Sequence, residues 1–296
     1  MEKPTALLIL NPVSGLTDAA QVQVRFEAFF QEAGWQTDIY LTTPASQTKA
    51  AVQQAVRAGV ALVVAAGGDG TLSEVADGLV GSGVPLGIVP CGTWNALSRN
   101  LGIPLVLDEA LRLLVVPHRL IPMDALAIRG RHYILNVGIG LSASVIQHTR
   151  REQKRRFGFL AYFANFFAQA SGLRQKVYRL TVDGREHKVR ATELMVINSS
   201  ILGMGELKTS FEINPSDGKV EILAARSPNL FGLMWIAARY LIGHQKRGPG
   251  LITFSATRSI SIRTRWSSTV QADGDIIGRT PVEIQIVPSA VQIIVP

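Results

Sequence analysis

The chain has 296 residues, of which 47% are hydrophobic, and its formal net charge is +8. This length predicts two domains with sizeable cores, and the single cysteine, Cys91, excludes an internal disulfide and favours a reducing compartment. The positive charge is typical of proteins that bind polyanions such as nucleic acids, anionic membranes or phosphorylated ligands.

Strands and helices alternate through the first third of the chain. A helix capped by Thr17 or Asp18 follows the first predicted strand, and a helix capped by Ser46 follows the second. The predicted strands comprise residues 6–10, 36–41, 60–66 and 85–89. Strands that are apolar throughout and separated by helices indicate a parallel sheet covered on both faces.

Each of these strands ends in a polar turn, and three of the four turns contain glycine. The turns comprise residues 11–15, 42–43, 67–71 and 92–95. In parallel sheets, ligands bind beyond the carboxyl ends of the strands. We therefore expect the four turns to form a ligand site at one edge of the sheet.

The turn Gly67-Gly68-Asp69-Gly70-Thr71 joins a buried strand to a helix. Its glycines let backbone N–H groups and the helix N-terminus approach a phosphate closely. No lysine follows the glycines, so the turn is not a P-loop, and its spacing is not that of a dinucleotide-binding motif. The Asp69 carboxylate fits a phosphate site if Mg²⁺ or ribose hydroxyls intervene; alternatively, it caps the helix.

The pattern changes to short strands after Met123, once a last helix over 108–115 has ended. The predicted strands comprise residues 126–128, 133–137, 177–182, 188–191, 193–198, 220–224, 260–263, 282–287 and 292–295. The strands 177–182 and 188–191 flank Asp183-Gly184, which is a strong hairpin signal. Short strands with frequent turns indicate a sandwich-like domain. We therefore expect an α/β domain over 1–120 and a β-rich domain over 121–296.

Two apolar helical segments, 157–173 and 230–242, interrupt these strands. Each lies beside a basic run, at 150–156 and 244–247. This combination is typical of transient, peripheral contact with an anionic membrane. An alternative is that the aromatic residues belong to the core and the basic residues form a solvated face.

Neither of the long uncharged windows fits a membrane-spanning helix. Residues 78–98 contain glycines and prolines, and residues 157–173 are slightly too short. The N-terminus has no signal pattern, and the basic residues belong to no recognisable nucleic-acid module. We therefore expect a cytoplasmic protein with no transmembrane segment and no nucleic-acid partner.

Three motifs together carry a family resemblance. They are N-P-x-S-G at 11–15, G-G-D-G-T-L-x-E at 67–74 and P-x-G-T-x-N-x-L-x-R-x-L-G-I-P at 90–104. The chain resembles the diacylglycerol kinase catalytic family, which includes bacterial diacylglycerol kinase-like lipid kinases and the sphingosine and ceramide kinases. The resemblance implies an α/β nucleotide-binding domain like that of NAD kinases and 6-phosphofructokinases, a β-rich lipid-substrate domain, and an active site between them. ATP, Mg²⁺ and a lipid with a free hydroxyl would be the ligands.

The resemblance also implies which residues contact ATP, and these belong to the turns at the sheet edge. Asp69 would bind the nucleotide or its Mg²⁺, and Asn95 is alternatively a structural cap. The implied ATP contacts are Asn11, Pro12, Val13, Ser14, Gly15, Thr42, Gly67, Gly68, Asp69, Gly70, Thr71, Leu72, Ser73, Glu74, Gly92, Thr93 and Asn95.

The catalytic base is implied by Asp273-Gly274-Asp275, which resembles the family's D-G-E motif with aspartate in place of glutamate. This leaves Asp273 and Asp275 as candidates, and we favour Asp273 because it matches the family residue directly. A plain hairpin turn is the alternative interpretation.

A structural Mg²⁺ site is implied by the loop at 214–219. Its ligands would be the Asp217 side chain and the carbonyl groups of Asn214 and Lys219, which are oxygen donors of the kind that Mg²⁺ prefers. A plain Asp-Gly turn fits this loop equally well.

Two other functions remain open at this point. One is a kinase of a soluble substrate, as in NAD kinases; the other is a regulatory protein that binds lipid or nucleotide without catalysis. The identity of the acceptor lipid and the oligomeric state depend on tertiary contacts that residue spacing does not reveal.

Overall fold

The computed structural model describes residues 3–15, 18–148, 175–199, 213–227, 229, 231–233, 235–236 and 250–296. The first part alternates strands and helices, as the sequence predicts. Its elements are β1 (Thr5–Leu10), α1 (Ala19–Glu32), β2 (Gln36–Leu41), α2 (Thr48–Arg57), β3 (Leu62–Gly67), α3 (Asp69–Leu79), β4 (Leu86–Pro90), α4 (Ala96–Asn100) and α5 (Leu107–Val115). Strands β2, β1, β3 and β4 are neighbours in that order and are all parallel.

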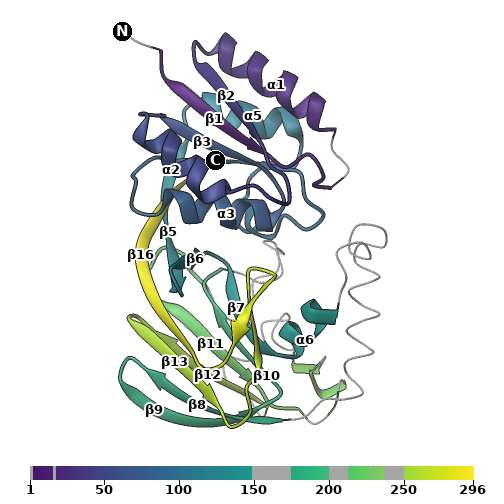
Figure 1. Cartoon of the computed structure of the whole chain (residues 1–296), viewed down its shortest axis with the longest axis vertical. Coiled ribbons are helices and arrows are strands. Elements are labelled where there is room, and N and C mark those ends of the chain that lie inside the picture. The colour runs from purple at the N-terminus through teal and green to yellow at the C-terminus, as the bar shows by residue number, and fades with distance from the viewer. Residues whose placement is uncertain are drawn as a thin grey trace.

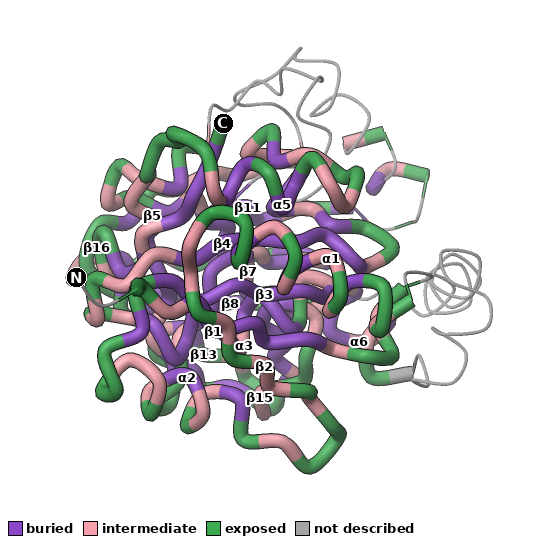
Figure 2. The backbone as a smooth tube through the Cα atoms, turned by 90° about the horizontal axis from the view of Figure 1, so that it is seen from above, coloured by how far each residue is buried: buried purple, intermediate pink, exposed green. Residues whose placement is uncertain are grey.

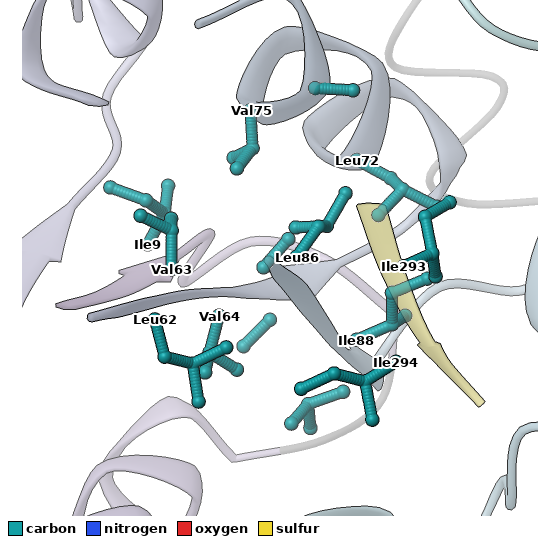
Figure 3. Close-up of a cluster of buried hydrophobic side chains, with 14 of the residues drawn as sticks. Ile9, Leu62, Val63, Val64, Leu72, Val75, Leu86, Ile88, Ile293 and Ile294 are labelled. Carbon is teal, nitrogen blue, oxygen red and sulfur yellow. The ribbon is translucent and has the colours of Figure 1, made fainter. Parts of the chain in front are cut away.

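Helices cover both faces of this sheet, with α1 beside α5 on one face and α2 beside α3 on the other (Figure 1). All six residues of β3 are buried. Val63 and Leu86 lie on the side of the sheet that faces Val75 of α3, whereas Leu62 and Val64 lie on the opposite side (Figure 3). The central strands are therefore buried, and the exposed positions lie mainly on the surrounding helices and loops (Figure 2).

The named elements of the second part, as far as the structure describes it, are antiparallel strands and the short helix α6. Its elements are β5 (Arg119–Ile128), β6 (Arg131–Tyr133), β7 (Asn136–Gly140), α6 (Leu141–His148), β8 (Lys176–Val182), β9 (Arg185–Ala191), β10 (Glu193–Ile197), β11 (Val220–Ala225), β12 (Leu251–Ala256), β13 (Ser259–Thr264), β14 (Thr269–Ala272), β15 (Asp275–Arg279) and β16 (Val282–Val295). One sheet has the order β12-β11-β10-β7-β14-β15. Its buried side chains pack against those of β5, β8, β13 and β16, so the second core lies between two sheets.

Strand β16 joins the two parts of the molecule (Figure 1). Ile284 and Ile286 near its beginning belong to the second core, whereas Ile293 and Ile294 near its end belong to the first. Ile293 pairs with Leu86 of β4, so the last strand extends the N-terminal sheet in the parallel direction. The predicted strands 282–287 and 292–295 are thus one continuous element. The division of the chain at residue 120 stays a prediction.

Several local predictions are confirmed, and others are wrong. Asp18 caps α1 by accepting a hydrogen bond from Ala20 N, at 3.0 Å. Ser46 does not cap α2, because its hydroxyl accepts from Thr43 N instead, at 2.7 Å, and Gln47 occupies the cap position. The predicted strand 133–137 is broken, since β6 ends at Tyr133 and β7 starts in the other sheet. Strands β12, β14 and β15 were not predicted.

The predicted segments 157–173 and 230–242 and the basic runs 150–156 and 244–247 lie outside the described residues, apart from short pieces at 231–233 and 235–236. Within the described ranges, no helix is long and apolar enough to cross a bilayer.

Asp77 connects α3 to the β5–β6 hairpin. Its side chain is almost fully buried, and one carboxylate oxygen accepts from Lys49 Nζ at 2.9 Å and from His132 N, also at 2.9 Å. Arg131 Nε lies 3.7 Å from the other oxygen, which has no hydrogen-bond partner among the described residues. A buried carboxylate surrounded by donors from two other elements fixes the hairpin against the helix.

We expect Asp77→Asn to lower the free energy of unfolding by about 1–3 kcal/mol, because hydrogen bonds to a charged group are lost at a buried site. Chemical denaturation would measure this loss. Asp108→Asn is the matched control, since Asp108 pairs with Arg25 on the surface, where ion pairs contribute little. Equal, small effects of the two substitutions would contradict the role assigned to Asp77.

Glu193 fixes the start of α6. Its half-buried side chain accepts from Ser142 N at 3.1 Å and from the Ser142 hydroxyl. Burial raises the pKa of Glu193 to about 7, although the bonds from Ser142 act in the opposite direction. Folding therefore disfavours the ionised form of the Glu193 carboxyl group relative to the protonated form.

The raised pKa predicts a loss of stability with rising pH. The folded protein holds the Glu193 proton more tightly than the unfolded chain does, so stability falls between the ordinary pKa of 4.5 and about 7, by about 3 kcal/mol. Glu193→Gln should remove this dependence in thermal unfolding followed from about pH 4 to about pH 8, a span that includes both pKa values. Glu186→Gln is the control, because Glu186 is exposed. If Glu193→Gln left the pH dependence of stability unchanged, the raised pKa would not belong to Glu193.

Candidate active site

The three glycine-containing turns meet at the carboxyl edge of the parallel sheet. A Cβ atom on Gly92 would lie 2.5 Å from the Cα of Gly68, and one on Gly15 would overlap the carbonyl oxygen of Cys91. A Cβ on Gly68 would come within 3.5 Å of Ser14 Oγ. Only glycine permits this close packing, so the structure brings together the turns at 11–15, 67–71 and 92–95, as the sequence predicts.

Asn11 and Thr71 connect two of these turns. Asn11 Nδ2 donates to Thr71 Oγ1 at 3.0 Å, and Asn11 Oδ1 accepts from Val13 N at 3.2 Å. Thr42 lies at the same edge, because its N–H continues the β1–β2 ladder to Leu10 O at 2.9 Å. Val13 and Thr93 are exposed, so this edge presents backbone and side chains of the turns to solvent.

Asp69 begins α3, and its side chain does not cap that helix. Gly68 occupies the cap position without a side-chain bond. The two carboxylate oxygens of Asp69 instead accept from Ala96 N, at 3.2 Å, and Leu97 N, at 3.3 Å, at the start of α4. The alternative interpretation, in which Asp69 caps the following helix, is therefore wrong. Each oxygen has a further lone pair, so a cation could bind while these bonds persist.

Asn95 is buried and has a structural role. Its φ angle of 47° lies in the left-handed region. Its side chain accepts from Gly92 N and donates to Gly92 O, both at 2.8 Å, and so closes the turn. It precedes α4 but makes no side-chain bond to that helix.

The Asp273 carboxylate links the second part of the molecule to α3. Oδ2 accepts from Ser73 Oγ at 2.6 Å and from Ile134 N at 2.9 Å. Oδ1 accepts from Leu135 N at 3.0 Å and from Asn136 N at 2.9 Å. Burial raises the pKa of Asp273, although these four bonds lower it.

The alternative interpretation of Asp273-Gly274-Asp275 as a hairpin turn is confirmed. Asp273 and Gly274 have φ angles of 46° and 88° and form the turn between β14 and β15. Asp273 points inward to its four donors, whereas Asp275 is exposed. The turn therefore delivers one carboxylate to the first turn of α3 and leaves the other in solvent.

The loop at 214–219 is held by a carboxylate that the sequence analysis did not single out. Buried Asp124 accepts from Gly218 N at 2.7 Å and from Ser289 N at 2.8 Å, and burial raises its pKa. Within the loop, Asp217 Oδ1 accepts from Lys219 N at 3.0 Å. The side chain of Asp217 and the carbonyls of Asn214 and Lys219 are oxygen donors that suit Mg²⁺. No group of three or more His, Cys, Asp or Glu side chains forms a metal cluster in the described part of the chain.

The sequence contained a signal for the missed carboxylates. Asp77 lies within a helix whose buried residues include Val75, Ala76 and Leu79, and Asp124 interrupts a buried strand. A charged residue in a buried stretch needs partners. Its position in the pattern does not say which residues supply them.

Sequence models of two protein families match the chain. The diacylglycerol kinase catalytic domain matches residues 5–128, and the YegS C-terminal NAD kinase beta sandwich-like domain matches residues 136–295. The two matches agree with the α/β part and the β-sandwich part of the structure, which confirms the predicted fold class.

Relatives of known name match over nearly the whole chain. A diacylglycerol kinase of Bacillus subtilis (strain 168) is 26% identical over 296 residues, which cover 98% of this chain and 96% of the relative. A diacylglycerol kinase of Mycobacterium tuberculosis is 27% identical over 299 residues, covering 99% and 95%. A crystal structure of a diacylglycerol kinase from Bacillus anthracis strain Sterne has the same fold, with a TM-score of 0.77, 22% identity and coverage of 100% of this chain and 98% of that one.

The close approach of Gly92 and Gly68 predicts that a side chain at position 92 destabilises the protein. Gly92→Ala should lower the free energy of unfolding by about 2–3 kcal/mol, because the new methyl group meets backbone atoms that cannot rotate away. Gly70→Ala is the matched control in a neighbouring turn, where an added Cβ meets nothing within 4 Å. Thermal unfolding of both variants measures the difference, and a stable Gly92→Ala protein would contradict the packing.

Proposed function

Because the chain belongs to the diacylglycerol kinase catalytic domain family and carries a YegS-type C-terminal domain, we propose that it transfers the γ-phosphate of ATP to a hydroxyl group of a lipid. The family is one of ATP-using lipid kinases. The observation that carries the proposal is the 2.6 Å contact between Ser73 Oγ and Asp273 Oδ2. It brings a carboxylate of the β-rich part within one helical turn of the glycine turn that starts α3.

The turns at the sheet edge would bind ATP. The N-terminus of α3 offers backbone N–H groups and a favourable dipole to phosphate oxygens. The space next to Gly70 is open, since a Cβ there meets nothing within 4 Å. We assign the contacts to the residues named above at 11–15, 67–74 and 92–95, together with Thr42. Mg²⁺ bound near Asp69 would neutralise charge on the transferred phosphate.

Asp273 is the proposed acceptor of the hydroxyl proton. A general base works best when its pKa is close to the working pH, and burial moves the pKa of Asp273 upward from its ordinary value of 3.8. The base must be deprotonated to act, so activity should fall as the pH drops through that pKa. Asp275 is exposed at the other end of the turn, which favours Asp273 over Asp275.

A second Mg²⁺ would have a structural role in the loop at 214–219. The ligands would be the Asp217 side chain and the carbonyls of Asn214 and Lys219. The hydrogen bonds from this loop to Asp124 and Pro122 of β5 would let a bound ion stiffen that strand. We further propose that the basic run 150–156 contacts an anionic membrane. The proposal also includes a cytoplasmic location.

The test of function is transfer of labelled γ-phosphate from ATP-Mg²⁺ to lipids in mixed micelles. Diacylglycerol is the first acceptor to test, because two full-length relatives carry that name. Phosphatidylglycerol, a sphingoid base and ceramide complete the panel, with NAD as the control. A labelled lipid would support the proposal and identify the acceptor. Label on NAD alone, or on no acceptor while ATP still binds, would contradict it.

Three substitutions test the roles of the carboxylates. Asp273→Asn should lower kcat by about 10²–10⁴-fold, which is the range for a lost general base. Asp69→Asn should abolish activity through weakened binding of the phosphates and Mg²⁺. Asp275→Asn, two residues away and exposed, should change kcat less than tenfold (about 1.4 kcal/mol). A larger effect of Asp275→Asn than of Asp273→Asn would reverse the assignment of the base.

A further inference from the structure

The hydrogen-bonding capacity of the Asp273 carboxylate is full. Each of its oxygens accepts two hydrogen bonds, which use the lone pairs that a carboxylate normally offers. An alcohol that approaches Asp273 directly therefore has to displace one of these donors. Direct proton transfer from a lipid hydroxyl to this carboxylate is not possible in the arrangement observed.

The four donors are not equivalent. Three are backbone amides of Ile134, Leu135 and Asn136, held where the chain passes from β6 to β7. The fourth is the hydroxyl of Ser73, which can rotate about its Cα–Cβ bond and comes from the other part of the molecule. A hydroxyl has one proton and two lone pairs, so Ser73 can accept a hydrogen bond while it donates to Asp273.

Ser73 also has a suitable position along α3. It follows Asp69 by four residues, so the two side chains lie on the same face of the helix, one turn apart. Their Cβ atoms are then separated by about 5–6 Å. An alcohol bonded to Ser73 Oγ would lie next to phosphates held at the start of the helix.

We propose that Ser73 is a proton relay between the acceptor alcohol and Asp273, an inference that rests on the proposed function. The alcohol proton moves to Ser73 Oγ while the Ser73 proton moves to Asp273 Oδ2. The alcohol oxygen bonds to the γ-phosphorus as the bond from that phosphorus to the bridging oxygen breaks, and ADP leaves with the electron pair. Asp273 afterwards returns its proton through Ser73 to water.

The kinetic test compares Ser73→Ala with Ser73→Thr, using the lipid that the wild-type protein phosphorylates best. The relay predicts that kcat falls at least 100-fold in Ser73→Ala (within the range of about 10²–10⁴ for general-base catalysis). Ser73→Thr should recover activity because it keeps a hydroxyl, whereas loss of an ATP contact alone would raise the KM for ATP and leave kcat unchanged. Thr48→Val is the control, since Thr48 Oγ1 is a buried hydroxyl of α2 that has no hydrogen-bond partner in the part of the chain that the structure describes.

If the alcohol instead displaces Ser73 from Asp273, the alanine variant would keep or increase kcat, and the relay would be wrong. A purely structural role predicts lower thermal stability of Ser73→Ala with an unchanged kcat, which would also overturn the relay. If the wild-type protein phosphorylates no lipid, the proposed function fails and the relay fails with it. If the wild type is active and Ser73→Ala is equally active, the relay alone fails.

A second readout does not depend on activity. The Ser73 bond lowers the pKa of Asp273, so Ser73→Ala should raise that pKa further. Because a raised carboxyl pKa makes stability fall with rising pH, the fall should extend to higher pH in Ser73→Ala than in the wild type or Ser73→Thr. Tyr133, Arg131, Asp77 and Asp275 are charged or titratable groups of the described residues around this site, and all variants share them. Superimposable curves of melting temperature against pH would show that the Ser73–Asp273 bond is absent in solution and would overturn the relay.

Discussion

The requirement to satisfy one buried carboxylate organises the centre of this molecule. Asp273 is about nine-tenths buried, and a charge at such a site costs several kcal/mol unless donors surround it. The donors come from α3 and from the segment between β6 and β7. The carboxylate itself comes from the β14–β15 turn. Three segments far apart in sequence are therefore fixed to one another by a single side chain.

Helix α3 contacts both the start of α4 and the β-rich part of the molecule. Its first residue, Asp69, holds the start of α4, and Ser73 and Asp77 follow at intervals of four residues. These side chains form a polar stripe on an otherwise buried helix, and two of them contact the β-rich part. The same helix thus presents its N-terminus to the glycine turns and its flank to the second part of the molecule. This arrangement explains how the α/β part and the β-rich part are held in register next to the proposed site.

The long strand β16 supplies a second, apolar connection. Its side chains enter both cores, and the strand pairs with β4, β5 and β13 along its length. Asn100 Nδ2 adds a polar contact to Ser199 Oγ at 3.0 Å between α4 and the chain after β10. Because polar and apolar contacts join the same two parts, a substitution at one connection should weaken the junction without separating them.

The sequence by itself determined the fold class, the positions of the glycine turns at one sheet edge and the Asp183-Gly184 hairpin, because periodicity and turn chemistry are local properties. It identified Asp273 as a candidate but left a catalytic base and a hairpin turn as alternatives; the structure confirms the hairpin turn, and the role as base stays a proposal. Only the tertiary structure decided that Asp69 accepts hydrogen bonds from the start of α4 and that Ser73 donates to Asp273. These contacts join residues up to 200 positions apart, and hydrogen-bond partners at such separations leave no trace in local spacing.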